Sequence, residues 1–138
     1  ILFKLIFDNP NANYSVKEVK AWRQVNQIDL LLEVYLLDNN DIPHNYVLNI
    51  ENKWYTNISD TQLIKYSEYI KSEYSNSDFI VKNIVTFCDS EKLKDGSNIQ
   101  KAMISNYSIT TVEDLKDVIG KLKTENHLFD EYWFKFYS

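Results

Sequence analysis

The chain is short of the residues that mark several protein classes. Its one cysteine, Cys88, excludes a disulfide framework and a cysteine-rich zinc module, and fits a reducing compartment such as the cytoplasm. With only two glycines and two prolines in 138 residues, it is neither collagen-like nor of low complexity. No apolar run approaches the roughly 20 residues that a membrane-spanning helix needs. We therefore expect a soluble, cytoplasmic protein with no membrane partner.

Positive charge is also scarce. The 15 Lys and Arg residues include one arginine, Arg23, and face 20 Asp and Glu, which gives a net charge of −5. Dedicated nucleic-acid binders neutralise phosphates with a basic face, so this balance argues against that class, although it does not exclude a metal-dependent nuclease. The glycines, Gly96 and Gly120, form no glycine-rich phosphate loop, which disfavours a kinase or a nucleotide-driven motor.

The residues that are present favour one packed domain. Hydrophobic residues make up 44% of the chain and charged residues 25%, as in globular proteins with a sizeable core. The chain starts without Met, directly at the apolar residues 1–7, and without the basic region and cleavage site of a signal peptide. We therefore expect a single domain, residues 1–138, that is a piece of a longer protein cut inside an element.

Three consecutive segments have the composition of strands, namely residues 14–22, 28–37 and 46–54. The second and third are separated by residues 38–43, Asp-Asn-Asn-Asp-Ile-Pro, which contain a dense turn signal. Because strands joined by short connections usually pair with each other, these segments predict an antiparallel meander.

A helical period begins at Ser59. Gln62, three residues later, completes a capping-box pattern, and apolar residues then recur at spacings of three and four. The short apolar run at residues 79–87 predicts a strand buried on both faces. The helix would thus cross from the third strand of the meander to this fourth strand.

The C-terminal part is less regular. Residues 99–109 fit either a helix or a strand, and both stay open. Thr110 with Glu113 predicts the start of a second helix, and the aromatic residues of 126–137 have the spacing of a short docking helix. The expected fold class is therefore α/β, with a central mixed four-stranded sheet made of the meander, a crossover helix and a fourth strand, flanked by helices.

One strand carries residues suited to chemistry. Alternate side chains of a strand share a face, so Glu51 and Lys53 point the same way, about 6.8 Å apart along the strand. Asp29 begins the preceding strand and can lie beside Glu51 in an antiparallel pair. Two converging carboxylates make a hard, oxygen-rich site that suits magnesium or manganese.

The order of these residues resembles the PD-(D/E)XK nuclease superfamily. Ile-Asp-Leu around Asp29, Ile-Glu-Asn-Lys at residues 50–53 and Gln-Leu-x-x-Tyr from Gln62 to Tyr66 look most like the bacterial nuclease-domain proteins of that superfamily linked to DNA defence or processing. Glu-x-Lys alone is common. The complete order and spacing, over residues 16–87, is fairly specific.

The resemblance implies a restriction-endonuclease-like fold and a nuclease that uses Mg²⁺ or Mn²⁺ to hydrolyse the phosphodiester bonds of DNA. Asp29 and Glu51 would hold the metal. Lys53 would orient or activate the attacking water and stabilise charge on the scissile phosphate. In exonuclease-like members, the residues that match Gln62 and Tyr66 contact the substrate or support the site.

Two departures from the family pattern matter. The first helix of the superfamily, which often supplies another acid, would precede this chain, so that the domain is truncated there and residues 1–7 are only the tail of that helix. Glu18, eleven residues before Asp29, is our candidate for an additional ligand, although it could be an ordinary strand acid. The second departure is charge, because substrate affinity would depend on the metal and on scattered lysines, among them Lys17, Lys20, Lys65 and Lys71.

Simpler interpretations exist for each of these residues. The acids and the lysine could form a salt-bridge cluster on a solvated sheet face. Gln62 could only partner the helix cap, and Tyr66 could only be core. His44 and His127 have no partner at metal-ligand spacing, and no residue is placed by sequence to activate Cys88, so all three are better explained as structural residues.

Alternatives of function, substrate and oligomeric state stay open. The main rival to a nuclease is a catalytically inactive nuclease-fold module that binds nucleic acid or a protein partner. The substrate could also be RNA, which no feature of the sequence excludes. A homodimer is open as well as a monomer, because many relatives that cut both strands pair two sites.

Overall fold

A computed structural model describes residues 2–9, 11–25, 27–53, 57–75, 77–87, 93, 96–111 and 113–114. Its elements follow the order helix, three strands, helix, strand, helix, strand. They are α1 (Leu2–Phe7), β1 (Tyr14–Val25), β2 (Ile28–Asp38), β3 (Pro43–Lys53), α2 (Asp60–Glu73), β4 (Phe79–Phe87), α3 (Ser97–Ile104) and β5 (Ser108–Thr111).

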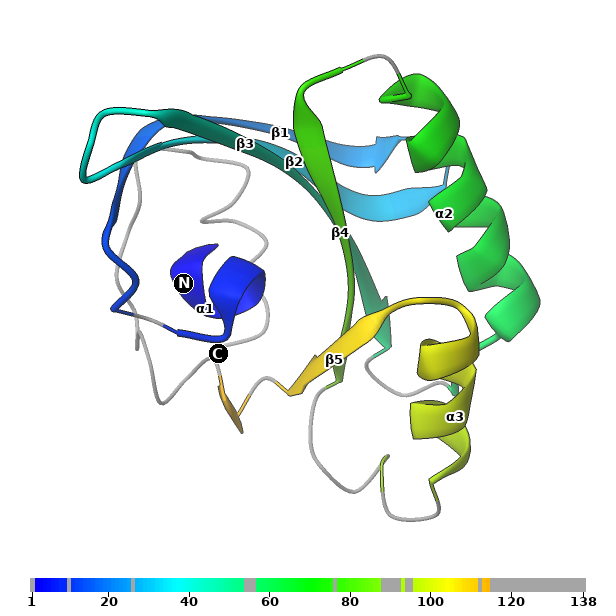
Figure 1. Cartoon of the computed structure of the whole chain (residues 1–138). Helices are drawn as coiled ribbons and strands as arrows, with labels where there is room; N and C mark the ends of the chain where they lie inside the picture. The colour runs from blue at the N-terminus through cyan, green and yellow to red at the C-terminus, as the bar shows by residue number, and fades with distance from the viewer. Residues whose placement is uncertain are drawn as a thin grey trace.

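All five described strands belong to one mixed sheet in the order β1-β2-β3-β4-β5 (Figure 1). The first three strands form an antiparallel meander, as predicted, whereas β4 pairs with β3 and β5 pairs with β4 in parallel. Parallel neighbours need a crossover connection, and α2 and α3 supply the two crossovers. The α/β class and the mixed sheet are confirmed.

Each face of the sheet is covered by different helices. The sheet curves around α1, while α2 and α3 lie on its outer side (Figure 1). Leu5 and Ile6 of α1 join a core cluster with side chains of β2, β3 and β4. Tyr66 and Ile70 of α2 pack on the other face, against Leu31 and other residues of the sheet. Because both faces are covered, β3 is buried along most of its length.

The prediction of four strands is wrong, because the structure has a fifth strand, β5. The segment 99–109, for which helix and strand were both open, contains the end of one and the start of the other: α3 ends at Ile104 and β5 begins at Ser108. The apolar residues of such a segment have no single period, because one part has helical and the other extended backbone.

The fourth strand, β4, has the predicted bounds, but only its second half is buried on both faces. Residues Phe79–Asn83 are partly or fully exposed, and burial begins at Ile84. The physical reason lies in the pairing, since β5 contacts β4 only from Ile84 to Phe87. The first half of β4 is therefore an edge of the sheet.

The helix signals give a mixed result. The side chain of Ser59 caps α2 by accepting a hydrogen bond from the Gln62 amide at 3.4 Å, as predicted. The second capping box is displaced by one residue from the Thr110–Glu113 prediction. Thr111 Oγ1 accepts from the Asp114 amide and Asp114 Oδ2 accepts from the Thr111 amide, each at 3.2 Å. The rest of this expected helix and the aromatic segment 126–137 lie outside the described residues.

Within the described part of the chain, no helix is long and apolar enough to cross a bilayer.

Truncation of a core leucine should destabilise the fold strongly. Leu32 of β2 is fully buried and belongs to the core cluster that includes Leu5 and Ile6 of α1. We expect Leu32→Ala to lower the free energy of unfolding by about 2–5 kcal/mol, through lost burial and the cavity left behind. Ile42→Ala, in a turn where the side chain is 52% exposed, is the control and should change it by less than about 0.5 kcal/mol. Equilibrium urea unfolding measures both, and equal losses would contradict the assignment of this core.

Candidate active site

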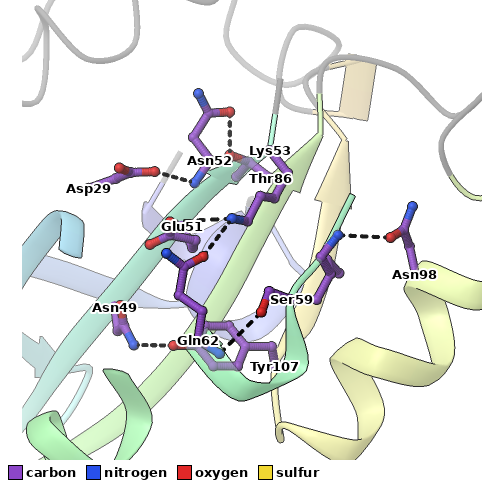
Figure 2. Close-up of polar contacts among 11 residues, drawn as sticks. Asp29, Asn49, Glu51, Asn52, Lys53, Ser59, Gln62, Thr86, Asn98 and Tyr107 are labelled. Carbon is purple, nitrogen blue, oxygen red and sulfur yellow. Dashed lines mark hydrogen bonds and ion pairs between the residues drawn. The ribbon is translucent and has the colours of Figure 1, made fainter. Parts of the chain in front are cut away.

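The pairing of β2 with β3 brings Asp29 next to Glu51. Leu30 pairs with Ile50, so the residue before Leu30 lies across from the residue after Ile50. The Asp29 carboxylate reaches over β3 and accepts a hydrogen bond from the backbone amide of Asn52 at 2.8 Å (Figure 2). This bond holds the carboxylate at the end of the strand pair, beside the Glu51 side chain.

Glu51 is the most unusual group of the cluster. Its side chain lies on the α2 face of β3, the residue is only 4% exposed, and Oε2 is buried without a hydrogen-bond partner among the described residues. Burial, and then the negative charge of Asp29, raise the pKa of Glu51 to about 7, although Lys53 opposes the shift. A buried carboxylate oxygen without a donor is costly, so the position suits a positively charged ligand.

Lys53 is held between Glu51 and α2. Its ammonium lies 3.8 Å from Glu51 Oε1 and donates a hydrogen bond of 3.0 Å to Gln62 Oε1 (Figure 2). The lysine is 8% exposed, so its charge is largely removed from water and depends on these two partners. The cluster is therefore not a solvated salt bridge on an open sheet face.

Gln62 contacts both the helix cap and the cluster. Its backbone amide donates to the Ser59 cap, while its side chain contacts Lys53. The cap thus fixes the first turn of α2, and this turn presents the Gln62 amide group to the site. In the first turn of α2, the backbone of Gln62 therefore helps to cap the helix while its side chain contacts Lys53.

Tyr66 is both a core residue and a neighbour of the site. It is 2% exposed and packs with Leu31 and Ile70. Burial, and next the charge of Glu51, raise the pKa of the Tyr66 phenol. Its hydroxyl also interacts with the Gln62 side chain. Tyr66 therefore supports the wall of the site on which Gln62 lies.

The structure does not bring Glu18 to this group. Glu18 is exposed on β1 and pairs with Tyr35, six residues along β2 from Asp29. At about 3.4 Å per residue this separation is roughly 20 Å along the strand. A bulge in β1 between Val16 and Glu18 shifts the pairing but leaves this distance large. The structure therefore places Glu18 away from Asp29 and Glu51.

A polar network next to the cluster was not identified from the sequence. Asn49, fully buried and two residues before Glu51, donates through Nδ2 to Asn83 Oδ1 at 3.1 Å and to the Tyr107 hydroxyl at 2.6 Å. Burial raises the pKa of Tyr107 far above its usual range. Because side chains alternate along β3, the sequence already placed Asn49 on the same face as Glu51, and this position could have indicated a polar neighbour of the acid. Its partner Tyr107 lies in the segment whose structure stayed open.

The other singled-out residues lie elsewhere. His44 Nε2 lies 2.9 Å from Asp38 Oδ2 in the β2–β3 turn, which is a structural role. His127 and Cys88 fall outside the described residues, so their interpretation as structural residues stays a prediction.

The donor set at the cluster fits a divalent ion. In the described part of the chain, no three His, Cys, Asp or Glu residues gather, so two carboxylates, Asp29 and Glu51, are the acids of this site. Mg²⁺ is commonly held by one or two carboxylates while water and substrate phosphate complete its shell. The buried, donor-free Oε2 of Glu51 is the atom that such an ion would satisfy.

The raised pKa of Glu51 predicts a specific pH dependence of stability. The folded state binds this proton up to about pH 7, whereas a free carboxyl releases it near 4.5. Stability contributed by this group should therefore fall as pH rises through that window. Urea unfolding in EDTA measures this effect. As pH rises from about 4.5 to about 7, the free energy of unfolding of the wild type should fall relative to that of Glu51→Gln. A difference independent of pH would contradict the assignment.

Comparison with known proteins identifies the family of the chain. The sequence profile of the PD-(D/E)XK nuclease superfamily matches residues 7–132, most of the chain. No curated protein is significantly similar to it in sequence. The solved structure of EndoMS in its apo form is similar over 80% of this chain and 44% of the EndoMS chain, with 15% identity and a TM-score of 0.35. Since the profile match extends over β1 to β5 and includes the Asp29, Glu51 and Lys53 cluster, the chain belongs to the PD-(D/E)XK nuclease superfamily.

Proposed function

We propose that the protein is a divalent-metal-dependent nuclease that hydrolyses phosphodiester bonds of DNA. Asp29 and Glu51 would hold Mg²⁺ or Mn²⁺. Lys53 would orient or activate the attacking water and stabilise charge on the scissile phosphate. The observation that carries this proposal is the buried Oε2 of Glu51, which has no donor among the described residues and lies beside a second carboxylate and a buried lysine. We further propose that residues 1–138 form one nuclease-like domain with a restriction-endonuclease-like core.

The side chains divide the chemistry between them. The bound ion would polarise a phosphoryl oxygen and lower the pKa of water. Lys53 would donate hydrogen bonds to the phosphate and counter the negative charge that develops there. Gln62, which accepts from Lys53 Nζ at 3.0 Å, would aim the ammonium, and Tyr66 would support Gln62. The Asn52 amide would keep the Asp29 carboxylate in place.

The negative net charge fits weak, metal-assisted substrate binding. With a net charge of −5, the protein repels DNA at long range. Binding of the backbone phosphate would then depend on the ion and on local lysines, and should weaken with salt. A role in DNA defence or DNA processing is our proposal for the pathway, following the bacterial proteins that the motif resembles.

Removal of any of the three central side chains should abolish cleavage. We expect Asp29→Asn, Glu51→Gln and Lys53→Ala each to lower the rate by about 100-fold or more, since the two acids would hold the metal and Lys53 would counter the negative charge on the phosphate. The assay follows cleavage of single-stranded, double-stranded and supercoiled DNA with Mg²⁺ or Mn²⁺. Circular dichroism must show that each variant is folded.

Two variants serve as matched controls for that assay. Glu18→Gln removes a strand carboxylate that pairs with Tyr35, and Lys82→Ala removes an exposed lysine of β4. Both should cleave at the rate of the wild type. Wild-type rates in folded Asp29→Asn or Lys53→Ala would refute the proposed site, and loss of activity in Glu18→Gln would return that residue to it.

Metal binding should also be visible without any substrate. An ion that binds only the folded state raises the free energy of unfolding by RT ln(1 + [L]/Kd), which is about 2.7 kcal/mol at 100 times Kd. We expect Mg²⁺ or Mn²⁺ to raise the melting temperature of the wild type and to leave that of Asp29→Asn unchanged. An equal shift in both proteins would place the ion elsewhere.

The second candidate function is an inactive nuclease-fold module that binds nucleic acid or a protein partner. It is favoured by the acidic net charge and by the gathering of only two acids at the described site. DNA binding without metal-stimulated cleavage in a folded, metal-loaded protein would select this module. Cleavage of RNA but not DNA would keep the enzyme and change its substrate.

A further inference from the structure

A cavity lies next to the proposed active site, on the α2 face of the sheet. Its volume is about 190 Å³, and its lining residues are Trp22, Leu31, Glu33, Tyr69, Glu73 and Tyr74. Leu31 comes two residues after Asp29 on the same face of β2, which is about 7 Å along the strand. On α2, Tyr69 follows Tyr66 by three residues, so it lies on the same side of the helix. The cavity therefore adjoins the site, since its lining residues follow the site residues along both β2 and α2.

Aromatic rings form much of this cavity. Trp22 lies on the edge strand β1, opposite Leu31, and is 40% exposed although it is the largest side-chain type. Tyr69 and Tyr74 line the cavity from α2 and from the residue that follows it. Exposed aromatic faces beside a phosphodiester site are suited to stacking on bases, because every base presents a π-face.

The charged residues of the cavity are acidic. Glu33 Oε1 accepts a hydrogen bond from the Tyr35 hydroxyl at 3.0 Å, and Oε2 accepts from the Tyr74 hydroxyl at 2.7 Å, so two phenols orient this carboxylate. Each oxygen retains capacity for a further donor. None of the described lining residues is Lys or Arg. Although Lys20 pairs with Glu33 from the neighbouring strand, the lining itself is acidic and is better suited to a neutral group that carries N–H donors than to a phosphate.

We propose that this cavity binds one unpaired nucleobase of the strand that is cut, an inference that rests on the proposed nuclease function. The backbone phosphate would lie at Asp29, Glu51 and Lys53 while the base turns away and stacks on Trp22. A paired base cannot enter such a cavity, so the substrate class is single-stranded DNA or a frayed or flipped nucleotide. Glu33 accepts most readily from bases with an exocyclic amino group, so cytosine should be preferred to thymine, whose one donor on the base is the ring N3–H.

Binding of short single-stranded DNA in EDTA tests the cavity apart from catalysis. We expect an oligodeoxycytidine to bind the whole chain, and Trp22→Leu to weaken it by roughly 5- to 100-fold, the effect of one lost base stack. Trp22→Phe, which keeps an aromatic face, should restore most of the affinity. Val16→Ala is the matched control on the same strand, 47% exposed, and should bind as the wild type does. Fluorescence anisotropy of a labelled oligonucleotide measures all four proteins.

The base preference gives a second arm of the same experiment. The wild type should bind oligodeoxycytidine more tightly than oligothymidine, and Glu33→Gln should reduce that ratio, provided that its thermal unfolding shows a folded protein. Equal affinity of Trp22→Leu and wild type, tighter binding to duplex than to single strands, or no binding of single strands would each overturn the cavity proposal.

The outcomes separate this inference from the proposed function. Single-stranded binding through Trp22 without cleavage at any divalent-metal concentration would keep the base cavity and refute the enzyme. Cleavage that is unchanged in Trp22→Leu, with the same KM for single strands, would keep the enzyme and refute the cavity.

Discussion

The register between β2 and β3 is the constraint on which the site depends. Because Leu30 pairs with Ile50, Asp29 and Glu51 meet across the strand pair, and Lys53 follows on the same face. A slip of one residue would turn Glu51 and Lys53 to the α1 face and bring Leu48 and Ile50 to the α2 face. The fully buried Leu30, Leu32, Leu48 and Ile50 prevent this slip, so the apolar core sets the position of the charged groups.

Burial gives these charged groups their chemical character. Glu51 and Lys53 are nearly removed from water, and the two acids exceed the one lysine in charge. Burial, and then the charge of Asp29, raise the pKa of Glu51, and its Oε2 has no hydrogen-bond donor among the described residues. Such a group destabilises the folded chain in the absence of a cation. A buried Glu51 carboxylate beneath α2 is therefore better explained by a role in binding a ligand than by a contribution to the stability of the fold.

The helix α2 connects the site with the proposed base cavity. Its first turn, held by Ser59, presents Gln62 to Lys53, and its later turns place Tyr69 and Glu73 along the cavity. The Tyr74 hydroxyl at its end binds Glu33 on β2. One rigid helix therefore positions both the cation that would contact a phosphate and the rings that would contact a base, which would fix the distance between the two contacts.

The sequence by itself determined the meander, the start of α2 at its cap, the bounds of β4 and the neighbourhood of Asp29, Glu51 and Lys53. These features follow from local rules, namely alternation along a strand, capping and short connections. Only the tertiary structure decided the fifth strand, the distance of Glu18 from Asp29, the contact of Asn49 with Tyr107 and the cavity at Trp22. Each of these depends on which strands pair, in which register, and on how helices cover a curved sheet. Such relations join residues far apart in the chain, and no local period of the sequence reports them.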